Sequence, residues 1–242
     1  MEYLRQEYED YKKARERGET FEQCNPFKAH AFISLARQLQ PHLRSGSRIL
    51  EVGFGSGYGL SLLEALGNRT VGAEIADYTF DYANSVYDEK GLTPRLVKAD
   101  GFQLPFQDDS FDLVLNVGTI EHFVPERQKH FVKEMARVSR DQVLISTPND
   151  SPDSGWARFK QSPVYCPEEE HLLDLNELSQ NLGLEVTRTG GFHAASTQNA
   201  RSIDELQERE FAMNDQDRAR FGFLKYTLSR KNKGLKTKRQ AA

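Results

Sequence analysis

Short apolar runs alternate with amphipathic segments through the middle of the chain. Five runs rich in branched and aromatic residues predict strands: Arg48–Val52, Thr70–Ala73, Pro94–Lys98, Phe111–Val117 and Gln142–Ser146. Three segments between them repeat their apolar residues at helical spacing: Gly59–Leu66, Tyr78–Lys90 and Glu126–Val138. Strands and helices in this alternation predict a parallel sheet with right-handed crossovers.

The first 42 residues have a helical pattern and no strand signal. Residues 1–20 are highly charged, with interleaved tyrosines, and predict a surface helix. His30–Leu39 predicts a more regular amphipathic helix that Pro41 ends. Residues 1–42 are therefore expected to form an N-terminal helical cap.

The pattern changes after residue 148. Residues 149–170 contain Pro152, Pro163 and Pro167 and predict a lid. Its aromatic residues are candidates for an apolar pocket or for a small satellite core: Trp156, Phe159 and Tyr165.

Two more strands are expected near the C-terminal end. Asp174 is expected to cap a helix that runs to Leu182, before a strand at Leu184–Thr189. Residues 190–220 predict an insertion with a helix around Ile203–Met213, and Phe221–Ser229 predicts a last strand at an antiparallel edge. Residues 231–242 form a basic tail.

Together these elements predict the fold class and narrow the functional classes. The expected fold is an α/β, Rossmann-like, doubly wound sheet of seven strands, mostly parallel with an antiparallel last strand, in a domain at residues 43–230. A net charge of −4 argues against a broadly basic nucleic-acid surface. Cys24 and Cys166 form no CxxC pair, and no run approaches the ~20 apolar residues of a membrane span. The charged start is unlike a signal peptide, so a cytoplasmic location is expected.

The most informative motif is the stretch Glu51–Gly57, which reads EVGFGSG, between a predicted strand and a predicted helix. Glycines at such a turn let a ligand approach the backbone, and the helix start offers free N–H groups. A dinucleotide fingerprint fails, because the third glycine would fall on Tyr58 or Leu60. A phosphate loop fails as well, since no Lys follows Gly57. The acid at Glu51 favours a ligand with an ammonium group.

Further motifs follow in order along the chain. Glu74 ends the second predicted strand, Asp100 lies after the third, and the fourth leads into Asn116–Phe123, which reads NVGTIEHF. With E-x-G-x-G-x-G, this set spans roughly Arg48–Thr147 and resembles the class I S-adenosylmethionine-dependent methyltransferases. The Glu-His pair resembles the ubiquinone/menaquinone-methyltransferase-like branch, methyltransferase type 11.

The resemblance implies a cofactor, S-adenosylmethionine, and a set of residues that bind it. In the family the acid at the position of Glu74 holds the ribose hydroxyls, and the acid at the position of Asp100 contacts the adenine amino group. Phe102 is expected on the adenine face or in the core. The full cofactor-binding set is Glu51, Gly53, Phe54, Gly55, Gly57, Tyr58, Glu74, Ile75, Asp100, Gly101, Phe102, Asn116 and Val117.

His122 is the candidate general base, because it follows the fourth strand at the edge where the methyl donor is expected. The alternative is a histidine that orients the loop or contacts the cofactor. Glu121 could hold its tautomer or cap a helix, and His171 could line the substrate mouth. The run Glu168–His171 is interpreted as a solvated run rather than a metal site, so no metal is expected.

These residues predict methyl transfer to a small-molecule acceptor, O- or C-directed, such as a metabolite, lipid or sugar. The fourth-strand motif lacks the Asn/Asp-Pro-Pro-Phe/Tyr stretch that similar enzymes use on nucleic-acid bases, so a nucleic-acid partner is disfavoured. The alternatives are an RNA or protein methyltransferase, a non-catalytic subunit with the methyltransferase fold, and an NAD(P)-dependent oxidoreductase. The oligomeric state is open.

Overall fold

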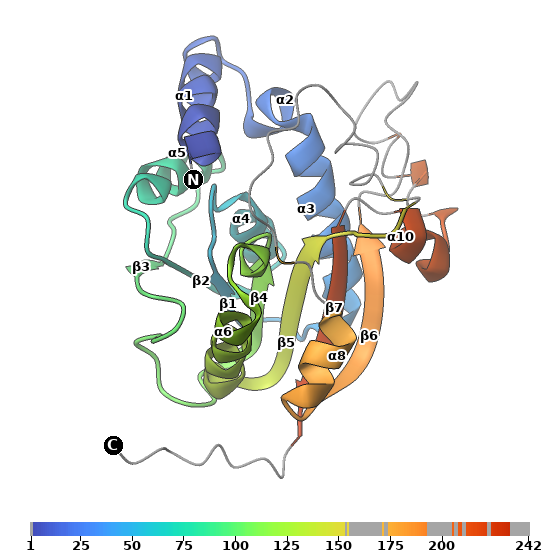
Figure 1. Ribbon diagram of the computed structural model, residues 1–242. Coiled ribbons are helices and arrows are strands. Elements are labelled where there is room, and N and C mark those ends of the chain that lie inside the picture. Colours follow the sequence, from blue (N-terminus) through green and yellow to red (C-terminus); the bar gives the residue numbers. More distant parts are fainter. Residues whose placement is uncertain are drawn as a thin grey trace.

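A computed structural model of the chain gives the architecture (Figure 1). It describes residues 2–152, 154, 171, 174–192, 205, 208–209, 212–221 and 224–232. Seven strands form one sheet: β1 Arg48–Val52, β2 Arg69–Glu74, β3 Leu96–Lys98, β4 Phe111–Val117, β5 Ser139–Pro148, β6 Leu184–Phe192 and β7 Leu224–Lys231. The described helices are α1 Glu2–Glu16, α2 Phe21–Cys24, α3 Pro26–Leu39, η1 Gln40–His42, α4 Tyr58–Ala65, α5 Tyr78–Glu89, η2 Ile120–His122, α6 Pro125–Val138, α8 Leu175–Asn181 and α10 Asp215–Phe221.

The strand order is β3-β2-β1-β4-β5-β7-β6, which confirms a doubly wound sheet. The pairs from β3 to β5 are all parallel, whereas β7 runs antiparallel to both β5 and β6. The order reverses between β1 and β4, where the crevice beyond the carboxyl ends binds ligands in open α/β sheets. The glycine-rich turn follows β1 at this position.

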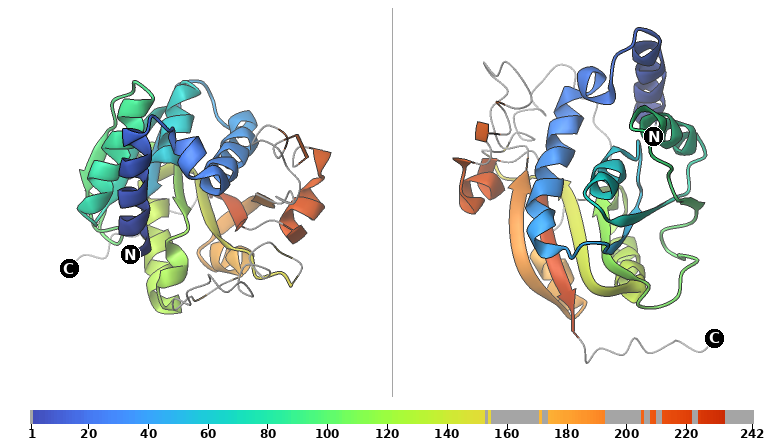
Figure 2. Two further views of the ribbon diagram at one scale, coloured as in Figure 1. Left: turned by 90° about the horizontal axis from the view of Figure 1, so that it is seen from above. Right: turned by 180° about the vertical axis from the view of Figure 1, so that it is seen from behind.

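Helices cover both faces of the sheet (Figures 1 and 2). On one face, α6 and α8 bury Phe131, Met135 and Leu178 against the sheet. On the other face, α3 and α4 bury Leu35 and Leu63 against β1, β4 and β5. The alternation of side chains along each strand feeds both cores, since consecutive residues such as Ile49 and Leu50 belong to opposite clusters. In the described part of the chain, no helix is long and apolar enough to cross a membrane.

The first two helices pack on α4 and α5 through polar and aromatic contacts. The Tyr11 hydroxyl donates to Glu89 at 2.7 Å, and the backbone N–H of Phe21 donates to the same carboxylate at 2.8 Å. Arg5 lies over the ring of Tyr78 at 5.0 Å. Because Tyr78 begins α5, α1 reaches the loop that follows β2.

Three expectations for the C-terminal part need correction. The last strand is antiparallel as expected, but it lies between β5 and β6 and is not an edge. It begins at Leu224, because residues 215–221 form α10. β6 runs on to Phe192, so the first residues of the expected insertion belong to the sheet.

Other predictions fall wholly or largely outside the described residues. They are the lid at 153–170 apart from Ser154, with Trp156, Phe159, Tyr165 and Cys166, the run Glu168–Glu170, most of the helix around Ile203–Met213, and the tail from residue 233.

Candidate functional site

The glycine-rich turn has a backbone that only glycine adopts readily. Gly53, Gly55 and Gly57 all have positive φ, at 80°, 53° and 70°. A Cβ on Gly53 would lie 2.4 Å from Thr119 Oγ1, and one on Gly57 would lie 2.8 Å from the Cβ of Ala83. A Cβ on Gly55 would meet nothing within 4 Å. The turn is therefore packed at both ends and open in the middle, where a ligand can reach the backbone.

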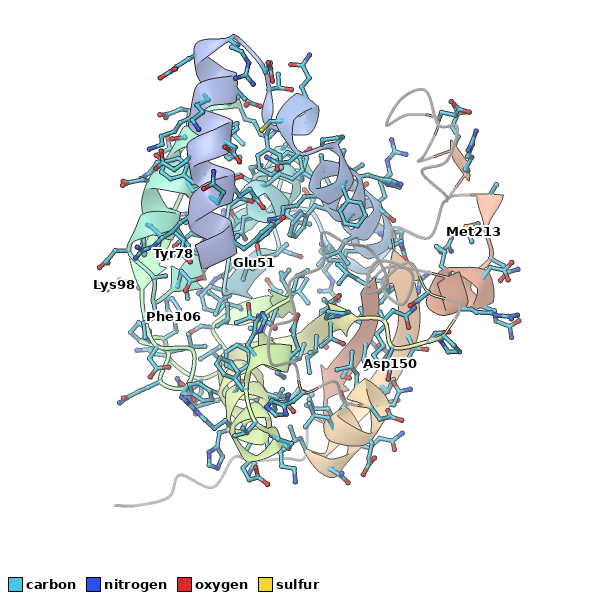
Figure 3. The ribbon with its side chains drawn as sticks, turned by 45° about the horizontal axis from the view of Figure 1, so that its top comes forward. Glu51, Tyr78, Lys98, Phe106, Asp150 and Met213 are labelled. Carbon is cyan, nitrogen blue, oxygen red and sulfur yellow. The ribbon has the colours of Figure 1, made fainter. Side chains whose placement is uncertain are left out.

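Glu51 lies near the end of β1, directly before this turn, and pairs with β2 and β4 on either side of the switch point (Figure 3 labels it). It is 1% exposed, and its Oε2 atom has no hydrogen-bond partner. Burial, with a smaller contribution from the charge of Glu74, raises the pKa of Glu51 to about 8. An ionised Glu51 without a partner would cost several kcal/mol, so the group keeps its proton at neutral pH unless a cation or a hydrogen-bond donor binds beside it.

The loops after β2 and β3 bring the two other predicted acids to the same edge. Glu74 Oε1 accepts from the backbone N–H groups of Ile75 and Ala76 at 2.7 and 3.2 Å. Asp100 is exposed, and its Oδ1 accepts from the N–H of Phe102 at 2.9 Å. The N–H of Ala99 donates to the carbonyl of Glu74 at 2.9 Å, which ties the two loops together.

Ile75 is an exposed apolar side chain beside Glu74, at 58%. It is available to a planar apolar group, as a cofactor-binding role requires. Gly101 serves close packing, since a Cβ there would lie 2.5 Å from the ring of Phe131. The ring of Phe102 packs 4.9 Å from that of Phe123 and 5.6 Å from that of Phe131. These contacts give Phe102 a core role, and its adenine contact stays a prediction.

The side chains of Phe54 and Tyr58 pack into the protein, and their predicted role in cofactor binding stays a prediction. Phe54 is 3% exposed and meets the ring of Phe80 at 5.4 Å. Tyr58 stacks on Phe21 at 4.3 Å, and its hydroxyl donates to Glu22 at 2.8 Å. What these two residues can offer a ligand at the turn is their backbone.

Asn116 and Val117 also stabilise the structure at the end of β4. The Asn116 amide donates to the carbonyl of Val52 at 2.6 Å and accepts from the N–H of Ile120 at 3.2 Å. It therefore fastens the end of β1 to the loop after β4. Val117 is half-buried and packs against the α3 side of the core. Asn116 acts on the site by positioning both loops.

His122 ends the short helix η2 and is exposed, whereas Glu121 before it is buried. The backbone N–H of His122 donates to the carbonyl of Thr119 at 3.2 Å. A segment distant in sequence also lies beside this helix, since the N–H of His171 donates to the carbonyl of Glu121 at 2.7 Å. Gln128 donates to the carbonyls of Ile120 and His171 at 3.2 and 2.8 Å. The backbone of His171 thus lies beside the candidate base.

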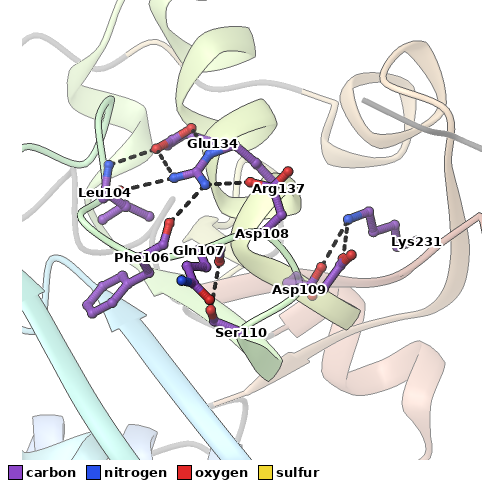
Figure 4. Close-up of polar contacts among 10 residues, drawn as sticks. Leu104, Phe106, Gln107, Asp108, Asp109, Ser110, Glu134, Arg137 and Lys231 are labelled. Atoms are coloured by element: carbon purple, nitrogen blue, oxygen red, sulfur yellow. Dashed lines mark hydrogen bonds and ion pairs between the residues drawn. The ribbon is translucent and has the colours of Figure 1, made fainter. Parts of the chain in front are cut away.

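Sequence reasoning missed the residue that holds the loop after β3. Arg137 of α6 donates to the carbonyls of Leu104 and Phe106 at 3.0 and 2.9 Å, and to Asp108 at 2.7 Å (Figure 4). Glu134 accepts from Arg137 and from the N–H of Leu104, each at 2.7 Å. These bonds fix the segment that follows Asp100. The spacing of Glu134 and Arg137 suggests a helical ion pair, but nothing in the sequence points to the loop.

Residues 50–146 match the family model described as a methyltransferase domain. A probable S-adenosylmethionine-dependent methyltransferase of Mycolicibacterium smegmatis is 33% identical over 159 residues, or 64% of this chain and 58% of the relative. A probable tRNA methyltransferase 9B of Mus musculus is 29% identical over 64% of this chain and 34% of the relative. The matched region therefore spans about a third to three fifths of the length of these relatives.

A similar fold occurs in solved structures. The magnesium protoporphyrin IX methyltransferase of Synechocystis PCC 6803, solved with S-adenosylhomocysteine, superposes with a TM-score of 0.62 over 88% of each chain at 14% identity. The matched methyltransferase domain is consistent with the strand order and with the glycine turn that follows Glu51. Residues 50–146 therefore match a methyltransferase domain, and the fold is the class I, Rossmann-like fold of S-adenosylmethionine-dependent methyltransferases.

Proposed function

We propose that this protein transfers a methyl group from S-adenosylmethionine to a small-molecule acceptor. The observation that carries the proposal is the buried carboxyl group of Glu51, which has an unpartnered oxygen and directly precedes an open glycine turn. A ligand with an ammonium group would supply the missing charge. Dinucleotides and nucleoside triphosphates bring phosphates instead, which Glu51 would repel.

The residues around the turn fit this cofactor. The open backbone at Gly55 would accept its amino-acid part, with Glu51 below. Glu74 would accept from the ribose hydroxyls with the oxygen atom that its backbone bonds leave over. Ile75 and the loop at Asp100 would hold the adenine. The bound cofactor supplies an electrophilic methyl group on a sulfonium.

In the proposed reaction an acceptor oxygen or carbon attacks the methyl carbon while the carbon–sulfur bond breaks. The bonding pair goes to sulfur and leaves S-adenosylhomocysteine. The proton of an acceptor hydroxyl passes to His122, which is exposed at the carboxyl end of β4. The protein contributes mainly by aligning the two reactants and keeping water out.

The acceptor is proposed to be a small molecule because the chain is acidic overall and has Asn116-Val117-Gly118-Thr119 after β4. The tRNA methyltransferase relative supports the alternative of an RNA acceptor. A protein acceptor and a non-catalytic subunit are further alternatives. An oxidoreductase is disfavoured by the failed dinucleotide frame.

The first prediction concerns the ligand. Calorimetric titration should give micromolar-range affinity for S-adenosylmethionine and S-adenosylhomocysteine, and no binding of NAD or NADP. The physical reason is the lone carboxylate at Glu51. Tight NAD binding without any response to S-adenosylhomocysteine would overturn the proposal.

The second prediction concerns the open turn. Gly55→Ala should lower S-adenosylhomocysteine affinity at least tenfold, because the added methyl group enters the space above the backbone. The control is Gly91→Ala, since Gly91 has a similar φ of 65° and also meets nothing within 4 Å, but follows α5. Both variants should lose ~1–2 kcal/mol of stability from the left-handed backbone. Equal affinities of the two variants would show that the turn is only structural.

The third prediction concerns the proton on Glu51. The folded, ligand-free protein holds it up to about pH 8, whereas the unfolded chain releases it near pH ~4.3. The folded state therefore binds more protons in this window, and the free energy of unfolding falls as pH rises, by up to ~1.4 kcal/mol per pH unit. Glu51→Gln should remove this fall and raise the melting temperature at about pH 8.

The same variant should also change cofactor binding. In the wild type, binding of an ammonium group favours ionised Glu51, so S-adenosylhomocysteine affinity should increase from about pH 5.5 to about pH 7.5 with proton release. In Glu51→Gln the affinity should be lower and independent of pH over this range. A wild-type affinity that does not vary with pH would remove Glu51 from ligand binding.

The fourth prediction concerns His122. His122→Ala should bind S-adenosylhomocysteine normally and lose at least about tenfold in single-turnover methyl transfer, the lower end expected for a removed base. Affinity and turnover are measured on one preparation, with an acceptor found by a labelled-donor screen. Loss of affinity in parallel would make His122 a cofactor contact, and full activity would leave His171 as the next candidate.

A further inference from the structure

Arg127, in the first turn of α6, places a cation beside the candidate site. Its guanidinium carbon lies 4.3 Å from the centroid of the Phe102 ring and 5.6 Å from that of Phe123. Phe102 comes two residues after Asp100, and Phe123 directly follows His122. The guanidinium therefore lies where the loops after β3 and β4 meet, beside both the expected adenine site and the candidate base.

The two arginines of α6 differ in what their side chains bind. Arg137 uses Nε, Nη1 and Nη2 in hydrogen bonds to the loop after β3 and to Glu134. Arg127 is exposed, and within the described ranges no carboxylate or carbonyl accepts from its guanidinium. A guanidinium has five N–H donors in one plane, which match the two oxygens of a carboxylate or phosphate.

The stability of the helix does not explain this position. Cations in the first turn of a helix oppose the partial positive charge of its N-terminus. Even so, Arg127 lies exposed in the first turn of α6, Lys129 lies exposed just beyond it, and Lys133 follows one turn later. Among the described residues, neither lysine has an ion pair, and Glu126 is the acid of this turn. An anion bound from solution would offset the unfavourable placement.

The aromatic rings also prepare Arg127 for binding. Stacking on Phe102 and Phe123 restricts the long side chain while its edge stays open to solvent. A pre-ordered group loses less conformational freedom when a ligand binds. Phe102 and Phe123 are themselves held against Phe131 of the core, so the platform is fixed.

We propose that Arg127 binds an anionic group, a carboxylate or a phosphate, of the methyl acceptor, so that the substrate is an acidic small molecule. This inference rests on the proposed function, because it assigns the acceptor of that reaction. A small acid is favoured over RNA because the carboxyl groups of Glu74 and Asp100 lie at the same edge of the sheet, where a long phosphate backbone would meet them.

The test uses protein saturated with S-adenosylhomocysteine and two pairs of probes that differ in charge. Benzoate is compared with benzamide, and phenyl phosphate with phenol, by ligand-observed NMR titration. In the wild type, at least one anion should bind about tenfold or more tightly than its neutral partner. The pair that shows the difference distinguishes a carboxylate from a phosphate.

Variants then assign the preference to Arg127. Arg127→Gln should bind the anion no more tightly than the neutral probe, with unchanged S-adenosylhomocysteine affinity and melting temperature. Arg127→Lys should keep part of the preference, since it retains the charge but not the planar donors. The matched control is Arg48→Gln, because Arg48 also lies over an aromatic ring, 5.7 Å from Phe111, but begins β1 at the opposite edge of the sheet. That variant should bind like the wild type.

Four results would overturn the proposal. They are equal binding of charged and neutral probes by the wild type, a preference that survives in Arg127→Gln, a loss of S-adenosylhomocysteine affinity in that variant, and salt-dependent binding of an RNA oligonucleotide with no binding of either small anion. Failure of the wild type to bind S-adenosylhomocysteine would instead count against the proposed function. In that case, an anion preference that the wild type shows and Arg127→Gln loses would still support the anion site.

Discussion

The buried carboxylate of Glu51 is the constraint on which the rest of the site depends. A chain selected for stability alone would place an apolar residue or an amide at the end of β1, because desolvation of a lone carboxylate is costly. The neighbouring strands add to the cost, since Glu74 brings a second negative charge toward it. Below about pH 8 the ligand-free protein avoids this cost by keeping Glu51 protonated, and a bound cationic ligand favours the ionised form. The turn that follows Glu51 is open at Gly55, where such a ligand can approach the backbone.

The residues around this carboxylate divide into those that face a ligand and those that hold the loops in place. Gly55, Glu74, Ile75 and Asp100 retain open space, spare acceptors or exposed surface at the carboxyl edge. Other residues with recognisable motif positions are already engaged. The Asn116 amide joins β1 to η2, and Tyr58 anchors the turn to the N-terminal helices. A position in a family motif therefore does not show whether a residue contacts the ligand or holds a loop in place, because both kinds of residue constrain the same loops.

The sequence predicted the strands and the mostly parallel, doubly wound sheet because parallel α/β units have a local signature, as in the runs at 48–52 and 111–117. The prediction failed where the local sequence pattern does not determine the structure. Phe221 continues the apolar character of FGFLKYTLS but belongs to α10, and the place of β7 inside the sheet depends on pairing with two distant strands. Arg137 and Gln128 could not be found for the same reason. Each donates to backbone carbonyls, which every residue has, so the sequence does not reveal these partners.

The charges at the carboxyl edge are separated in a way that suits the proposed chemistry. Carboxylates at the ends of β1 and β2 attract a cationic methyl donor and disfavour anionic nucleotides. The guanidinium of Arg127 lies between the loops after β3 and β4. An acidic acceptor held there would have its charge neutralised by Arg127. The sulfonium loses its positive charge as the methyl group leaves, so donor and acceptor need opposite electrostatic surroundings before transfer. Carboxyl groups at the strand ends and a guanidinium on α6 meet this need at one edge of the sheet.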